Sequence, residues 1–189
     1  MSGLVLQKGR KYFVPSTHTW LKITSLFSDT KNFKYMTQVQ LQFEVGITDR
    51  GLDDIGDITS IQFPVHLMSA SSTQQNTWHK VRKDQEILNI HWDAHLITKA
   101  DELYHTIWET IDEKTTIKSP VDGVCIGVND FSAQNMKYRV HSDKSLFSMR
   151  TSMDHLQELN DQGQLMDCKE YTNYVKTLEA GIFFDPDQS

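Results

Sequence analysis

Alternation of apolar and polar residues predicts β-sheet in the first part of the chain. Residues 38–45 (Gln-Val-Gln-Leu-Gln-Phe-Glu-Val) alternate without a break, which is the period of a half-buried strand. Residues 20–26 follow a mixed form of the same pattern, and the turn-rich residues 28–32 lie between the two runs. The pattern therefore predicts a β-hairpin built from these two strands.

A short helical turn is predicted directly after this hairpin. Thr48 or Asp49 can cap its amino end, and Gly56 can close it. Residues 58–63 then resume an extended apolar pattern, whereas residues 69–76 are polar and weakly patterned, which is typical of a surface loop.

A second hairpin is predicted in the middle of the chain. Residues 106–111 and 115–118 are rich in β-branched side chains, and Asp112-Glu113-Lys114 lies between them. The pattern therefore predicts a second hairpin with its turn at residues 112–114. The turn signal Asp122-Gly123 leads into a further strand over residues 124–128.

The carboxyl-terminal part changes to a helical period. Its apolar residues are spaced by three and four with polar residues between them, which predicts a helical segment over about residues 152–180. These residues are Leu156, Leu159, Leu165, Met166, Tyr171, Tyr174, Val175 and Leu178. The expected fold is mainly β, with one short helical turn and carboxyl-terminal helices.

Length and charge narrow the classes of protein. The 189 residues suit one domain spanning residues 1–189, with 19 basic and 25 acidic side chains and a formal charge of −6. Because no dense Lys/Arg stripe occurs, we expect no nucleic-acid partner. Since no run approaches the ~20 apolar residues that a spanning helix needs, we expect no membrane span and at most peripheral contact.

The cysteines and the amino terminus indicate a compartment. Only Cys125 and Cys168 occur, which excludes a disulfide framework or a zinc knuckle and suits a reducing interior. Cys125 lies in an apolar run and is expected to be a small buried hydrophobe. No acid precedes Asp29, and the charge bias of this segment is that of a mitochondrial address. Its basic residues are Lys8, Arg10, Lys11 and Lys22.

Candidate chemistry is sparse along the chain. No serine-nucleophile motif and no glycine-rich phosphate loop occurs in the sequence. The acidic residues Asp53, Asp54 and Asp57 fit the negative charge that is favoured at a helix start. No catalytic centre is therefore predicted, and the chain is not expected to be an enzyme. His91 and His95 have the i, i+4 spacing of two metal ligands on a helix. A third ligand is not identifiable, so we predict no metal site and interpret the segment as solvated or facing a partner.

Three segments in fixed order resemble the H-protein of the glycine cleavage system, a small lipoyl carrier. The first segment is His18-Thr19-Trp20-Leu21. The second is Val45-Gly46-Ile47-Thr48-Asp49, followed by Gly56-Asp57-Ile58 and Pro64. The third is Glu109-Thr110-Ile111, followed by Ser119-Pro120-Val121-Asp122-Gly123. The resemblance implies a lipoyl/biotinyl-type flattened barrel, or barrel-sandwich hybrid, with a modifiable lysine at a hairpin tip. Relative to that family, residues of about 67–98 form an extra segment.

The chain departs from the family pattern at the lipoyl position. In the family, the lysine precedes the serine of Ser-Pro by seven residues, and seven residues before Ser119 stands Asp112. An aspartate has no amine to acylate, so the resemblance implies a degenerate site without a cofactor. The same register implies that residues 111–113 form the exposed tip of the hairpin, with Asp112 facing solvent or a partner. Lys114, two residues further on and ~6.5 Å along a strand, is the alternative attachment point for lipoate.

Four large aromatic residues are candidate partner-binding residues. Trp78 and Trp92 lie in the extra segment, and Phe183 and Phe184 follow the expected helices. Our leading hypothesis is a non-catalytic, H-protein-like accessory subunit of a larger mitochondrial assembly, with other protein subunits as partners. Two alternatives remain open: a working lipoyl carrier modified at Lys114, and a binding module that uses the former lipoyl cleft.

Overall fold

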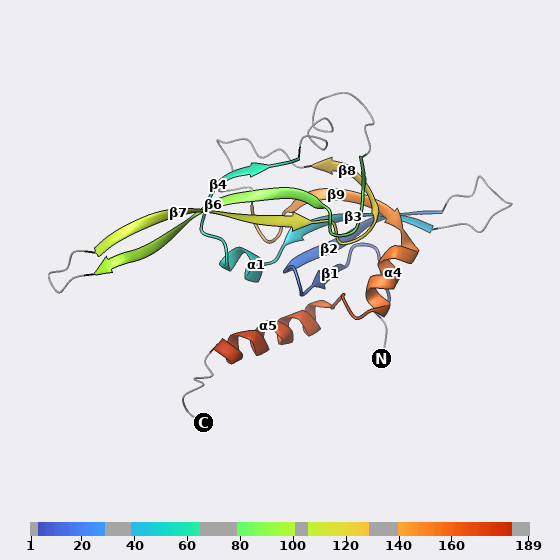
Figure 1. Cartoon of the computed structure of the whole chain (residues 1–189). Coiled ribbons are helices and arrows are strands. Elements are labelled where there is room, and N and C mark those ends of the chain that lie inside the picture. The colour runs from blue at the N-terminus through green and yellow to red at the C-terminus, as the bar shows by residue number, and fades with distance from the viewer. Residues whose placement is uncertain (1–3, 29–38, 65–78, 101–105, 129–139, 183–189) are drawn as a thin grey trace.

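The chain folds mainly as two antiparallel β-sheets with helices at its carboxyl-terminal end (Figure 1). The computed structural model describes residues 4–28, 39–64, 79–100, 106–128 and 140–182. Within these residues neither sheet closes into a barrel. The expected fold class is thus confirmed at the level of a mainly β protein with carboxyl-terminal helices.

The larger sheet has six strands in the order β1-β2-β3-β9-β8-β5. Their bounds are β1 Lys11–Val14, β2 Thr19–Ser28, β3 Val39–Ile47, β5 His79–Val81, β8 Gly123–Val128 and β9 Ser145–Ser152. β2 and β3 pair from Thr19 opposite Ile47 to Ser28 opposite Val39, with an irregularity after Ile23. The first predicted hairpin is confirmed, and so is the predicted strand at residues 124–128.

The smaller sheet has the order β4-β6-β7, with β4 Asp57–Gln62, β6 Glu86–Ala100 and β7 Thr106–Lys118. β4 pairs with β6 only as far as Asp57 opposite Asp93. β6 and β7 continue together beyond that point to Ala100 opposite Thr106. Residues 94–100 and 106–111, which we call the β6–β7 ribbon, extend away from the body of the molecule (Figure 1).

The second predicted hairpin is wrong. Residues 106–118 form the single strand β7, and β7 pairs with β6 along its length. Asp112 therefore lies within a strand, opposite Asp93, rather than at a tip. The three polar residues at 112–114 resemble a turn sequence. These positions are exposed to solvent, however, and an exposed stretch of strand can contain polar side chains.

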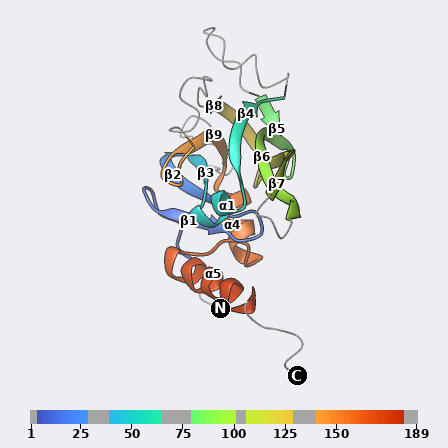
Figure 2. The same ribbon diagram turned by 90° about the vertical axis from the view of Figure 1, so that its left-hand side faces the viewer.

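Three helices complete the described structure: α1 Asp49–Asp53, α4 Met153–Asp161 and α5 Cys168–Ile182. Thr48 caps α1, because its Oγ1 accepts a hydrogen bond of 3.1 Å from the backbone N–H of Gly51. This confirms the predicted helical turn and Thr48 as its cap, but the helix ends at Asp53 with Asp54 as its C-cap, and Gly56 does not close it. α4 with α5 confirms the predicted carboxyl-terminal helices. α5 runs below β1, outside both sheets (Figures 1 and 2).

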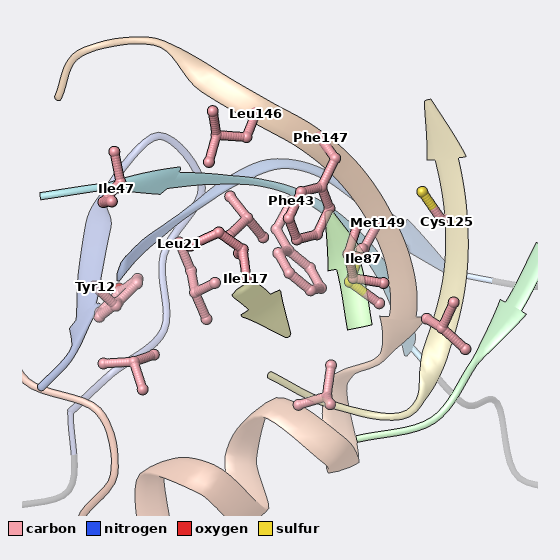
Figure 3. Packing of buried hydrophobic residues seen from close by; sticks show 14 of the residues in the cluster. Tyr12, Leu21, Phe43, Ile47, Ile87, Ile117, Cys125, Leu146, Phe147 and Met149 are labelled. Atoms are coloured by element: carbon pink, nitrogen blue, oxygen red, sulfur yellow. The ribbon is translucent and has the colours of Figure 1, made fainter. Parts of the chain in front are cut away.

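The hydrophobic core combines side chains from both sheets and is closed at one end by α4 (Figure 3). In β3 the alternation seen in the sequence places Leu41, Phe43 and Val45 inside. Other core members come from the remaining strands and from α4: Leu21, Ile23, Ile87, Leu88, Ile90, Ile117, Cys125, Leu146, Phe147, Met149, Leu156 and Leu159. The burial of Cys125 confirms its prediction as a small hydrophobe.

Residues 79–92 are an integral part of this core. They supply β5 and the beginning of β6, and Ile87, Leu88 and Ile90 are completely buried. Of the described residues in the expected extra segment of about 67–98, only those from Ala94 onward lie beyond the end of β4. These residues form part of the β6–β7 ribbon, where only two strands are paired. Residues 65–78 lie outside the described residues.

Candidate functional site

The position of the expected lipoyl lysine lies on the smaller sheet, at the point where the β6–β7 ribbon begins. Asp112 is exposed and pairs with Asp93, which in turn pairs with Asp57 of β4. Directly opposed residues of neighbouring strands point to the same face, so three carboxylates share one row. Like charges in such a row repel each other and disfavour close packing.

Lys114 occupies an equivalent mid-strand position two residues further along β7. It is exposed and pairs with His91 of β6. Neither Asp112 nor Lys114 lies at a hairpin tip, because β6 and β7 stay paired beyond both residues, as far as Ala100 opposite Thr106. The expectation that residues 111–113 form the tip is therefore replaced by a ribbon that continues past them.

His91 and His95 lie on a strand, so the helical spacing that suggested paired metal ligands does not apply. His95 is exposed, and its Nε2 lies 3.3 Å from Oδ2 of Asp57, which places an imidazole beside the carboxylate row. Among the described residues, no group of three His, Cys, Asp or Glu side chains is arranged to hold a metal ion.

Of the four expected partner-binding aromatics, only Trp92 belongs to the described residues. It is half-buried, packs against the core, and donates a hydrogen bond of 3.0 Å from Nε1 to Oγ1 of Thr115. An alanine at Trp92 would thus disturb the domain itself and cannot by itself report on an interface. Trp78, Phe183 and Phe184 lie outside the described residues.

A second candidate site lies where α5 meets β1, β2 and α1, and it was not predicted from the sequence. Its centre is Tyr171 of α5, which is 7% exposed. The Tyr171 hydroxyl lies 2.8 Å from Nδ1 of His18 and 2.9 Å from Oγ1 of Thr48. Its ring stacks on Phe13 with centroids 4.7 Å apart and an interplanar angle of 7°.

The hydrogen-bond roles in this cluster follow from the cap of α1. Thr48 Oγ1 already accepts from the Gly51 N–H, so its own hydrogen is available for the Tyr171 oxygen. The Tyr171 hydrogen can then be donated to Nδ1 of a neutral His18. The four groups form one directional chain that ties α5 to α1 and to the turn before β2.

The protonation states agree with this direction. Burial lowers the pKa of His18, the positive charge of Arg50 lowers this pKa further, and Asp54 opposes the shift. Burial also raises the pKa of Tyr171, although its hydrogen bond to Thr48 acts in the opposite direction. Both side chains are therefore uncharged near neutral pH, as the chain of donors requires.

Acid is expected to weaken the fold through His18. Its pKa is lower in the folded chain than the ordinary value of 6.5, so the unfolded chain takes up this proton first. The free energy of unfolding should fall as the pH drops from about 7.5 to about 5.5. Denaturant unfolding of the wild-type chain and of His18→Asn at both pH values measures this contribution.

Asn is the matched replacement because His18 has a φ of 51°, a left-handed backbone that asparagine tolerates. His18→Asn should lose less stability on acidification than the wild-type chain does. An identical pH dependence in the two proteins would contradict the assigned role of His18.

A cavity of about 430 Å³ lies beside Tyr171, between α5 and the ends of β1, β2 and α1. We call it the α5 cavity. Its wall includes Lys11, Phe13 and Trp20 from the sheet, Arg50 from α1, and residues of α5 such as Val175. Neither Asp112 nor Lys114 contributes to it, so it is separate from the position at which the family resemblance expects the lipoyl lysine.

No protein-family model and no curated protein matches the chain. The resemblance to the H-protein family therefore rests on the motifs quoted above. Among the described helices, none is long and apolar enough to cross a membrane.

Proposed function

We propose that this chain is a non-catalytic accessory subunit of a larger mitochondrial protein assembly, with a scaffold similar to the glycine cleavage H-protein. Its partners would be other protein subunits. Two antiparallel sheets around one core, followed by carboxyl-terminal helices, agree with the architecture that the resemblance implies. We infer that the two sheets correspond to the flattened barrel of the lipoyl type.

The observation that carries this proposal is the place of Asp112 within a continuous strand. A carrier must present its lysine at the end of a hairpin, where a ligase and then successive enzymes can reach it. Here an aspartate occupies the position, and β6 and β7 continue beyond it to Ala100 and Thr106. A carboxylate cannot form the lipoyl amide, and the extended ribbon would obstruct access to a tip-recognising enzyme.

The alternative, a working lipoyl carrier modified at Lys114, is favoured by one observation. The Lys114 side chain is exposed, so its amine is accessible to solvent. However, Lys114 pairs with His91 in mid-strand, and an arm attached there would leave from the face of the sheet. The accessory role therefore fits the geometry better.

Native purification tests the proposal. A tagged full-length chain, isolated gently from the cells that make it, should co-purify with the same protein subunits at constant stoichiometry. Lys114→Gln, which cannot be acylated, should assemble as well as the matched variant Lys118→Gln on the same strand. Recovery only as a free monomer, or loss of function confined to Lys114→Gln, would contradict the accessory role.

A further inference from the structure

The α5 cavity has the size and the walls of a small-molecule site. Its volume of about 430 Å³ falls within the range of pockets that hold small ligands. One wall is the larger sheet, the other is α5, and Tyr171 fixes the distance between them through Phe13, His18 and Thr48. The cavity is therefore held open by a defined set of contacts.

The charged groups of the cavity are distributed unevenly between its wall and its rim. Among the charged side chains that line the cavity, the two least exposed are the cations Lys11, which is 33% exposed, and Arg50, which is 24% exposed. The acid that faces Lys11 is Asp143, whose side chain is 94% exposed and lies 3.8 Å from the ammonium group. Such an exposed pair neutralises little of the cation's charge.

Arg50 is also incompletely neutralised. Its guanidinium Nη1 lies 3.3 Å from Oδ1 of Asp54, whereas its Nε makes no hydrogen bond within the part of the chain that the structure describes. The positive charge of Arg50 lowers the pKa of His18, and the negative charge of Asp54 acts in the opposite direction. The inner wall thus carries positive charge, and the acids Asp49 and Glu179 are exposed at the rim.

Part of the remaining wall is aromatic, and the rest includes small polar and aliphatic side chains such as Thr172 and Val175. Phe13 and Tyr171 are stacked, and the Trp20 ring lies under the Lys11 ammonium, 4.2 Å from the ring centroid. Trp20 is held in place because its Nε1 donates to the carbonyl oxygen of Ser142 at 2.6 Å. Flat aromatic walls suit a planar or apolar ligand body, and the two cations suit an anionic end.

We propose that the α5 cavity binds a small carboxylate with a flat, apolar body, whose carboxylate faces Lys11 and Arg50. This inference goes beyond the accessory role, since none of the residues at the degenerate lipoyl position lines the cavity.

Calorimetric titration of the full chain with indole-3-acetate tests the proposal, and the neutral indole-3-acetamide is the matched probe. We expect the acid to bind at least about tenfold more tightly than the amide, because its carboxylate can form charge-assisted contacts with Lys11 and Arg50 that the neutral amide cannot form. In NMR spectra, the indole N–H signal of Trp20, assigned through Trp20→Phe, should shift on addition of the acid.

Two variants locate the binding. Lys11→Gln should weaken binding of the acid about fivefold or more. Lys22→Gln is the matched control, because Lys22 pairs with Lys11 across β1 and β2 but lies outside the cavity, and it should leave binding unchanged. Equal binding of acid and amide, no effect of Lys11→Gln, or no binding of the acid at millimolar concentration would overturn the proposal. None of these outcomes depends on the accessory role.

Discussion

Gly46→Ala is expected to destabilise the chain by about 3 kcal/mol, near the upper end of what overpacking costs. Gly46 lies in β3 directly opposite Trp20 of β2, and a Cβ at this position would overlap the indole ring. Trp20 is 2% exposed and its Nε1 is bonded to the Ser142 carbonyl, so the ring cannot move away without losing that bond. Denaturant unfolding measures the change.

Gly127→Ala is the matched control, because a Cβ on Gly127 of β8 would meet no atom within 4 Å. Its free energy of unfolding should stay within about 0.5 kcal/mol of the wild-type value. If Gly46→Ala were as stable as Gly127→Ala, the close packing of Trp20 on β3 would be wrong.

Tyr171→Ala is expected to cost about 3 kcal/mol and to release α5 from the sheet, since buried aromatic-to-alanine changes cost about 3–5 kcal/mol. The substitution removes the stack on Phe13 and both hydroxyl contacts at once. Hydrogen exchange of the α5 amides should increase together with the loss of stability measured in denaturant.

Tyr171→Phe separates the contribution of ring stacking from that of the hydroxyl hydrogen bonds, because it keeps the stack on Phe13 and removes only the hydroxyl. It should cost about 1–2 kcal/mol through the groups left without a partner. Lys169→Ala, at an exposed position of the same helix, should leave α5 protected. Unchanged exchange in Tyr171→Ala would show that α5 is held by other contacts.

The sequence was sufficient to predict the secondary-structure elements whose signal lies within their own residues. β3 was predicted because its strict alternation suits a sheet with one buried face, and α1 was predicted because Thr48 is a strong helix cap. α4 and α5 were predicted from their apolar spacing. In each case the signal lies within a few consecutive residues.

The sequence was insufficient where distant residues decide the outcome. The polar residues 112–114 suggested a turn, but their place was set by pairing with β6, a segment whose mixed pattern gave no clear prediction. Polar side chains at exposed strand positions cost little, so they do not mark a strand end.

The cluster around Tyr171 was missed for the same reason. In the sequence, His18 belongs to one motif, Thr48 belongs to another motif and is a candidate helix cap, and Tyr171 is one of the apolar residues at helical spacing. They are separated from Tyr171 by 153 and 123 positions along the chain, and only the folded sheet brings them together. No short-range pattern encodes such a contact.

The central claim is that the lipoyl position has lost its carrier chemistry, and intact mass spectrometry of the chain isolated from its own cells tests it most directly. The account predicts the unmodified mass, because Asp112 has no amine and Lys114 lies in mid-strand, opposite His91. A single lipoyl adduct that maps to Lys114 and disappears in Lys114→Gln would contradict the account and identify the chain as a carrier.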